Sequence, residues 1–340
     1  MFREDLCNRC GKCLSQCQWM DIDHKKAVEL IEKLINKEHT PVLDNCITCY
    51  ACNEFCPENA HPFELIASLQ EKYYTLCPKG KLDAVEKRFS STEEVVQPPQ
   101  ADQIMSLCVF KETNPNLIEG ELYDLPQVSG KPYFCWVLFS HMGGVSIQKN
   151  HVKALIQRLA LSKPKEVVCF HDDCYTMLAH LAPAYGFDVP FRPVHLAEHI
   201  VRCLKKTRLS LNSLDIKIAY QRPCASRYTP EKEKFIDELF DIVGVKRVDR
   251  IYDQQNAMCC AGVKKILGMD DPAPYQEENI MDAVNAGARA LVCLCPMCMK
   301  SLATTADRHN LPIIFIGDLA RLAIGEINID DYLRKGRNNE

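Results

Sequence analysis

One stretch of the sequence decides the fold of the C-terminal part of the chain: Val292-Cys293-Leu294-Cys295-Pro296-Met297-Cys298. A short apolar run that ends in such a loop is typical of a buried strand, and a helical pattern follows it. An earlier stretch aligns with it without gaps: Val168-Cys169-Phe170-His171-Asp172-Asp173-Cys174. The chain therefore contains two copies of one strand–loop–helix unit.

Further apolar runs and helical patterns surround both copies. We expect buried strands at residues 133–139, 166–170, 216–220 and 290–294. We expect helices at residues 147–161, 197–206, 230–242 and 275–286. Strands that alternate with helices predict small parallel sheets covered by helices, with ligands on the loops at the carboxyl ends of the strands.

The second copy carries five cysteines in three predicted loops: Cys224, Cys259, Cys260, Cys295 and Cys298. Adjacent soft thiolates such as Cys259 and Cys260 suit multi-iron ligation better than a strained vicinal disulfide. Cys295 and Cys298 open a predicted helix, where free amide groups and the helix dipole favour thiolates. The pattern predicts a metal cluster in this copy.

Cysteine content and charge narrow the class of protein. The chain has 340 residues and 20 cysteines, and their close spacing without an export signal favours metal ligation over a disulfide framework. A net charge of -4 offers no basic surface for nucleic acid. No apolar run approaches the roughly 18 residues of a membrane helix. We expect a cytoplasmic protein with no membrane span of its own; docking on the inner membrane face through partners is the alternative.

Two cysteine runs near the N-terminus have the spacing of bacterial ferredoxins, in which three cysteines hold one cubane and the fourth reaches the companion cluster. We assign the first 4Fe-4S cluster to Cys7, Cys10, Cys13 and Cys56. We assign the second to Cys46, Cys49, Cys52 and Cys17. The alternative is a pair of zinc sites, which would prefer two cysteine pairs separated by a longer loop.

The remaining N-terminal pattern suggests the domain organisation. Helices are expected at residues 24–37 and 63–74, and Cys77 is expected to be a buried structural thiol. A polar, proline-bearing segment follows and has the composition of a linker. We expect a helical region at 1–90, a linker at 91–104, one α/β unit at 105–209 and another at 210–340.

The double ferredoxin run followed by Cys…Cys-Cys-x-Gly…Cys-x-x-Cys resembles the cysteine-rich (CCG) domain family of heterodisulfide reductases. The resemblance covers nearly the whole chain and implies the small iron–sulfur and catalytic subunits fused together. It implies a mixed fold, with an α-helical ferredoxin-like region and two tandem α/β CCG units. It also implies a non-cubane 4Fe-4S cluster, with these residues as ligands and catalytic groups: Cys224, Cys259, Cys260, Cys295 and Cys298.

The first copy departs from the family pattern. By position, Cys108 would match Cys224, Ser140 and His141 the adjacent pair, and His171 and Cys174 the Cys-x-x-Cys motif. One interpretation is a site that has lost its ligands and is kept for its fold. The other is one zinc or iron ion, because imidazole and thiolate suit both metals. Its candidate ligands are Cys108, His141, His171 and Cys174.

Three functions fit these motifs. The first is the electron-transfer and catalytic subunit of a heterodisulfide reductase-like oxidoreductase complex, passing electrons through two cubanes to a non-cubane cluster that acts on a thiol/disulfide or a partner redox centre. The alternative is an iron–sulfur relay of a flavin-dependent dehydrogenase of the glycolate or glycerol-3-phosphate type, which delivers electrons to a quinone or cytochrome. A zinc-bearing structural module is the third. Expected partners are a flavoprotein or a membrane cytochrome/quinone module, with a thiol/disulfide substrate.

One other histidine pair has a spacing that suits metal ligation. His195 and His199 are one helical turn apart. We expect instead a partly exposed helix face.

Overall fold

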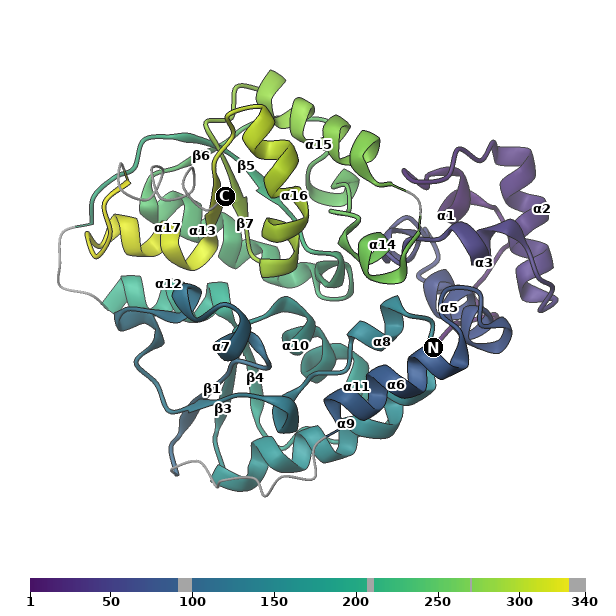
Figure 1. Cartoon of the computed structure of the whole chain (residues 1–340), viewed down its shortest axis with the longest axis horizontal. Coiled ribbons are helices and arrows are strands. Elements are labelled where there is room, and N and C mark those ends of the chain that lie inside the picture. Colours follow the sequence, from purple (N-terminus) through teal and green to yellow (C-terminus); the bar gives the residue numbers. More distant parts are fainter. Residues whose placement is uncertain (91–99, 207–210, 270, 330–340) are drawn as a thin grey trace.

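A computed structural model describes residues 1–90, 100–206, 211–269 and 271–329. N-terminal helices lie beside two α/β units, and each unit is built on a four-stranded parallel sheet (Figure 1). This is the mixed fold that the sequence predicts. Across these ranges, every helix is too short or too polar to span a membrane.

The N-terminal helices surround the two ferredoxin runs. They are α1 (Lys12–Ser15), α2 (His24–Ile35), α3 (Pro41–Asn45), α4 (Ala51–Glu54), α5 (Pro62–Tyr73) and α6 (Lys79–Phe89). Helices α2 and α5 confirm the two helices predicted here. The Asp23 side chain begins α2 by accepting a hydrogen bond from the amide of Lys26 at 2.9 Å. The apolar face of α2 is buried against α5, so the cysteine loops rest on a packed helical base.

The two sheets have the same construction. The strands of the first are β1 (Gln103–Ser106), β2 (Gln127–Val128), β3 (Glu166–Cys169) and β4 (Arg192–His195). Those of the second are β5 (Lys217–Gln221), β6 (Lys246–Arg247), β7 (Ala290–Cys293) and β8 (Ile313–Phe315). The orders are β2-β1-β3-β4 and β6-β5-β7-β8, with every pair parallel. We call them the first and second α/β units, and their shared order confirms the repeat.

Helices cover both sheets. The first unit contains α7 (Phe110–Thr113), α8 (Leu138–His141), α9 (Val145–Leu159), α10 (Asp172–Thr176), α11 (Ala182–Ala184) and α12 (Leu196–Lys206). The second contains α13 (Glu233–Val243), α14 (Gly262–Leu267), α15 (Ala273–Asn285), α16 (Pro296–Arg308) and α17 (Ile316–Ala323). Helices α9, α12, α13 and α15 confirm the four predicted ones. Helix α12 packs against α13 and α17 between the sheets (Figure 1). The rings of Phe170 and Phe315 join the cores, with centroids 5.4 Å apart.

Three of the four predicted strands are confirmed as β3, β5 and β7, and the fourth, at residues 133–139, is wrong. That run forms a buried turn and then α8, because a short apolar run does not distinguish a strand from a buried loop. Trp136 has a φ of 66°, which an extended strand excludes. Part of the proposed linker, residues 91–99, lies outside the described residues, and the domain boundaries stay a prediction.

Two smaller predictions have opposite outcomes. Cys77 is buried, as predicted, and packs in the core of the first unit. The expectation that His195 and His199 lie on a partly exposed face is wrong, because both are buried. The Nε2 atom of His199 pairs with the carbonyl of Leu122 at 2.8 Å, so this side chain is tied to its own unit.

Candidate metal centres

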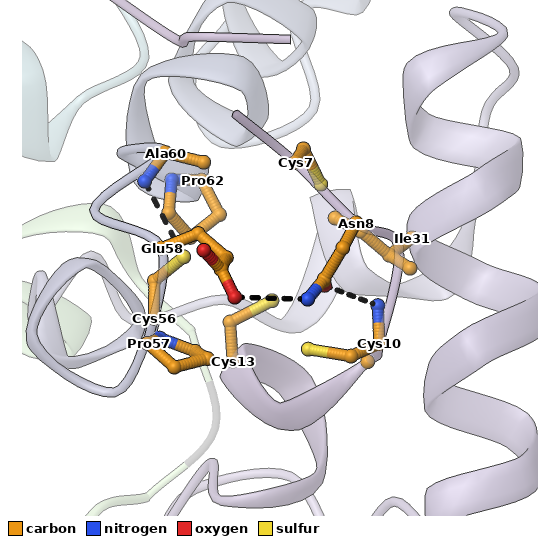
Figure 2. Close-up of a pocket in the computed structure, with 11 residues that line it drawn as sticks. Cys7, Asn8, Cys10, Cys13, Ile31, Cys56, Pro57, Glu58, Ala60 and Pro62 are labelled. Carbon is orange, nitrogen blue, oxygen red and sulfur yellow. Dashed lines mark hydrogen bonds between the residues drawn. The ribbon is translucent and has the colours of Figure 1, made fainter. Parts of the chain in front are cut away.

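The first cysteine quartet lines one pocket near the N-terminus (Figure 2): Cys7, Cys10, Cys13 and Cys56. Gly11 has a φ of 71°, and a Cβ there would lie 2.7 Å from the amide nitrogen of Val28, so only glycine lets this loop approach α2. The Asn8 side chain accepts from the amide of Cys10 at 3.1 Å and donates to Glu58 at 3.0 Å. The two runs are thereby tied together around the pocket, as the first cubane assignment requires.

The second quartet adjoins the first: Cys17, Cys46, Cys49 and Cys52. Burial, together with the neighbouring Cys49, raises the pKa of Cys17 to about 11. Burial also raises the pKa of Cys52, with added effects from Cys46 of the same quartet and Cys13 of the first. Buried neighbouring thiols are hard to ionise without a cation, and metal binding removes that obstacle because it deprotonates them.

The five cysteines of the second unit converge from three loops. Cys224 begins a 3-10 turn (Cys224–Tyr228) after β5, and Cys259 and Cys260 directly precede Ala261 and α14. Cys295 follows β7 and is the N-cap residue directly before α16, with Cys298 in the first turn of that helix. Cys224 is half-buried, and the other four cysteines of this group are at most 7% exposed. The predicted helix position of the Cys-x-x-Cys motif is therefore confirmed.

The five sulfur atoms form a continuous group. The Sγ atoms of Cys224 and Cys259 are 3.3 Å apart. Electrostatic effects link the other sulfurs, because Cys260 acts on the pKa of Cys259, Cys298 on that of Cys260, and Cys295 on that of Cys298. The Cys298 thiol lowers the pKa of Cys295 to about 6, with His171 acting in the same direction against the effect of burial. A buried group of soft donors with this many sulfurs is suited to iron–sulfur ligation.

Side chains fix the loop that carries the adjacent pair. The carbonyl of Cys260 accepts hydrogen bonds from Gln276 at 2.8 Å and from Ser301 at 2.9 Å. The amide of Cys259 donates to the hydroxyl of Tyr275 at 3.2 Å. A Cβ at Gly262 would lie 3.3 Å from the Ser301 side chain, so glycine here keeps room for that bond. Such supporting contacts orient metal ligands.

The first unit contributes a histidine to this site. The Nε2 atom of His171 lies 3.1 Å from the Sγ atom of Cys295, and its Nδ1 atom lies 3.6 Å from Asp173. Burial alone would lower the pKa of His171, but Asp173 and Cys295 raise it to about 10. The imidazolium form therefore faces the sulfur of Cys295 at neutral pH.

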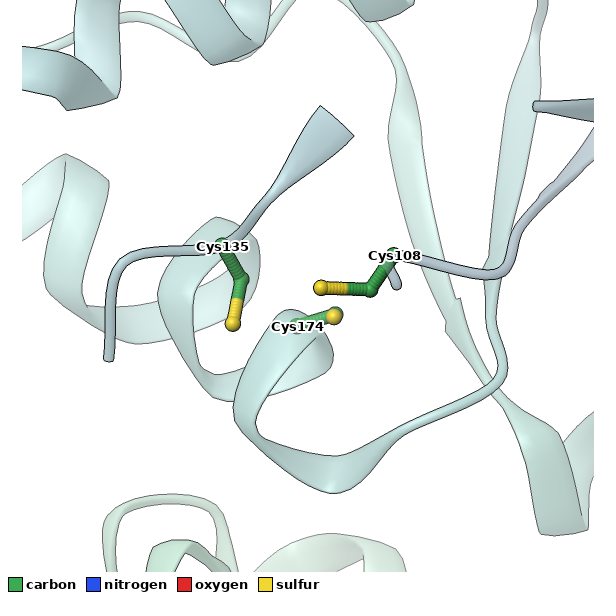
Figure 3. Close-up of side chains that lie close together, drawn as sticks. All are labelled: Cys108, Cys135 and Cys174. Atoms are coloured by element: carbon green, nitrogen blue, oxygen red, sulfur yellow. The ribbon is translucent and has the colours of Figure 1, made fainter. Parts of the chain in front are cut away.

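The structure does not bring the four-residue ligand set predicted for the first unit together as one group: Cys108, His141, His171 and Cys174. His141 instead pairs with the hydroxyls of Thr48 and Tyr50, each at 2.9 Å. Cys108 and Cys174 do meet, but their third neighbour is Cys135 (Figure 3). The spacing in the sequence could have identified Cys135. It precedes His171 by 36 residues, just as Cys259 precedes Cys295 in the second copy.

Aromatic and polar residues missed by the sequence analysis connect the second quartet to the five-cysteine group. Burial raises the pKa of Tyr275, and the nearby Cys259, Cys49 and Cys17 raise it as well. Cys259 belongs to the five-cysteine group and the other two to the second quartet, so Tyr275 lies near both groups. The ring of Trp19 meets that of Tyr275 edge to face, with centroids 4.8 Å apart. The second quartet is thus separated from the five-cysteine group by little more than one aromatic layer.

A buried ion cluster holds this contact together. The Glu54 carboxylate pairs with Arg222 at 2.8 Å and with Arg227 at 2.6 Å, and both arginine side chains are at most 4% exposed. Gln18 adds a hydrogen bond of 3.0 Å to the side chain of Asn256. The helical region therefore docks on the second unit through specific charged groups.

Comparison with known proteins identifies the N-terminal part. Residues 1–57 match the family model of the 4Fe-4S dicluster domain. The chain is 31% identical over 128 residues to a dihydromethanophenazine:CoB–CoM heterodisulfide reductase subunit from Methanosarcina acetivorans. Over that part of its length, the chain is therefore similar to a heterodisulfide reductase subunit. The corresponding subunit from Methanosarcina mazei is 26% identical over 151 residues.

The matches cover only part of each chain. They take in 36% and 43% of this chain, and 31% and 36% of the two relatives. The chain thus spans about a third of the length of the curated relatives it matches. A crystal structure of a hypothetical protein from Helicobacter pylori is similar with a TM-score of 0.58 and 13% identity, covering 89% of this chain and 65% of that one. That likeness concerns the fold alone.

Proposed function

We propose that the chain is the iron–sulfur subunit of a heterodisulfide reductase-like redox complex, with two cubanes and one non-cubane 4Fe-4S cluster. The observation that carries the proposal is the five-cysteine group beside the second ferredoxin quartet. The proposed ligands of this third cluster are Cys224, Cys259, Cys260, Cys295 and Cys298. When bound, the three clusters supply one-electron transfer.

The order of the sulfur groups supports an electron path. Cys13 and Cys52 are neighbours across the two quartets. The thiol of Cys259 lowers the pKa of Cys224, but burial, Cys260 and Cys49 together raise it, so Cys49 of the second quartet is close enough to act on Cys224. Electrons would therefore pass from the first quartet to the second and then to the five-cysteine group, or in reverse.

His171 gives the five-cysteine group a proton donor. Reduction of a disulfide to two thiols consumes two electrons and two protons, so a donor is needed where the electrons arrive. The Nε2 atom of His171 lies against the Cys295 sulfur, and Asp173 lies near its Nδ1 atom, so a proton on Nε2 would point at that sulfur. The curated relatives are named for a CoB–CoM heterodisulfide. We infer a thiol/disulfide pair as the substrate class for this chain, acting with further subunits.

The test is anaerobic purification followed by iron and sulfide analysis and electron paramagnetic resonance of the reduced and oxidised protein. We expect about twelve irons per chain and a resonance that changes when a disulfide or its thiol is added. A Cys77→Ser variant should keep the same iron count and the same resonance. Its buried thiol lies in the hydrophobic core and outside the five-cysteine group. Colourless, iron-free protein would overturn the proposal. A brown protein that responds only to a co-purifying flavoprotein would favour the relay function instead.

A further inference from the structure

The two ferredoxin runs place residues in the left-handed backbone region at the same two positions. In the first run these residues are Arg9 and Gly11, with φ values of 58° and 71°. In the second run they are Thr48 and Tyr50, with φ values of 56° and 63°. Glycine adopts this region freely, but a β-branched threonine there is an outlier that needs support from its surroundings. The second run therefore carries more backbone strain than the first.

His141 of α8 supports both strained residues of the second run. Its Nδ1 atom lies 2.9 Å from the hydroxyl of Thr48, and its Nε2 atom lies 2.9 Å from the hydroxyl of Tyr50. The Tyr50 ring also stacks on the imidazole, with centroids 4.8 Å apart, and all three residues are buried. By contrast, Arg9 of the first run reaches the surface, where it pairs with Glu32 at 3.2 Å. The conformation of the second run thus depends on a side chain from the first α/β unit.

The two hydrogen bonds of His141 have defined directions. The Thr48 hydroxyl has one proton and donates it to the carbonyl of Ile47 at 2.7 Å. This hydroxyl can therefore only accept from His141, so the Nδ1 atom carries a proton. Burial lowers the pKa of His141 and favours the neutral ring, which leaves Nε2 to accept from the Tyr50 hydroxyl. The imidazole thus matches the two hydroxyls with one donor and one acceptor.

The supported backbone directs an amide group at a proposed cluster ligand. The amide of Thr48 donates to the Sγ atom of Cys46 at 3.4 Å. Hydrogen bonds to the sulfurs of an iron–sulfur cluster are among the factors that set its reduction potential, and they raise it because they offset the charge of the added electron. We propose that His141 is a positioning residue for the second cubane, which holds Thr48 and Tyr50 in the left-handed conformation and thereby raises the reduction potential of that cluster. The inference rests on the second cubane of the proposed function, but not on the third cluster or the substrate.

The experiment measures the reduction potentials of both cubanes in the full chain, by redox titration followed with electron paramagnetic resonance. His141→Phe keeps a ring beside Tyr50 but removes both hydrogen bonds. At a fixed potential we expect the ratio of reduced to oxidised second cubane to fall about tenfold, which is about 59 mV for one electron, while the first cubane keeps its potential. A Cys10→Ser variant changes a proposed ligand of the first cubane alone, so it shows which signal belongs to which quartet.

Two further variants separate positioning from general packing. His141→Gln keeps one donor and one acceptor on its side-chain amide, so it should restore at least half of the shift. His199→Phe is the matched control, because this buried histidine of the first unit bonds to the carbonyl of Leu122. It should leave both potentials unchanged.

Each outcome decides for or against the role of His141. Unchanged potentials in His141→Phe, equal shifts of the two cubanes, or the same loss in His141→Phe and His141→Gln would overturn the inference. Loss of the second cubane in His141→Phe and its return in His141→Gln would support it, because the ligand loop would then require the same two hydrogen bonds. A missing third cluster would contradict the proposed function and leave this inference standing, whereas iron-free protein would contradict both.

Discussion

The first and second α/β units have the same strand order but carry different groups at the carboxyl ends of their strands. The second unit gathers five cysteines there, whereas the first gathers three. Where the second unit has Cys295, the repeat places His171 in the first, and the two side chains contact each other. The strands and helices therefore set the fold of both units, and the loop residues decide the chemistry of each.

The largest expected effect comes from a pair of variants in the second unit. They distinguish a cysteine that binds the proposed cluster from one that only lies near it. Cys260→Ser removes one proposed ligand, and we expect iron to fall from about twelve to about eight per chain, with complete loss of disulfide-dependent activity. Cys293→Ser is the control, since this thiol is buried in β7 near Cys295 and Cys260 without belonging to the sulfur group. Equal iron losses in the two variants would mean that the site collapses without specific ligation.

The next effect concerns the charge buried between the two units. Asp172 of the first unit pairs with Lys232 of the second, and both side chains are 0% exposed. Asp172→Ala leaves the ammonium group unpaired, so we expect a loss of about 3–5 kcal/mol in the free energy of unfolding, measured with urea under anaerobic conditions.

A matched double variant tests the cause of that loss. Asp172→Asn combined with Lys232→Met removes both charges and should recover most of the stability, because a buried pair replaced by neutral groups is often tolerated. If Asp172→Ala cost less than about 1 kcal/mol, or if the double variant recovered nothing, the ion pair would not be the link between the units.

A smaller effect tests how the helical region docks on the second unit. Glu54→Gln keeps the shape of the side chain but removes the charge that faces Arg222 and Arg227. We expect a loss of about 2 kcal/mol in unfolding free energy, in the range of hydrogen bonds to charged groups, and faster proteolysis of the N-terminal helices. The control is Glu29→Gln, since among the contacts described its exposed carboxylate pairs only with Lys26 of the same helix. Similar proteolysis rates in both variants would contradict a specific docking contact.

The smallest effect is an electrostatic difference between the sheets. Glu166 in β3 stands where β7 has Ala290, and it pairs with Arg192 and Arg202. Burial raises the pKa of Glu166, but the two arginines outweigh it and leave the pKa below the usual value. The stabilisation is therefore present above the unfolded-state pKa and is lost as pH falls through the folded-state value.

The corresponding variant is Glu166→Gln. It should cost less than about 1 kcal/mol at pH 7, because the pair is partly exposed, and its stability should fall less between pH 6 and pH 3 than that of the unmodified chain. Identical pH profiles would show that this ion cluster contributes nothing.

Much of the fold could be predicted because its signals are local. The ferredoxin spacing and the apolar face of α2 both lie within short windows of sequence. The strand β1, of four residues beside a polar segment, left no comparable pattern. Cys135 was missed because Ser140 and His141, followed by Gly143-Gly144, resemble the Cys-Cys-x-Gly loop in position. They were therefore aligned with the adjacent cysteine pair. The contact between His171 and Cys295 depends on how two units pack, which no single window contains.

The central claim is that the five-cysteine group of the second unit holds a third iron–sulfur cluster beyond the two cubanes. Iron and acid-labile sulfide counts on the anaerobically purified, unmodified chain test it most directly. The account predicts about twelve of each per chain. A count of about eight, with full occupancy of both ferredoxin quartets, would contradict it.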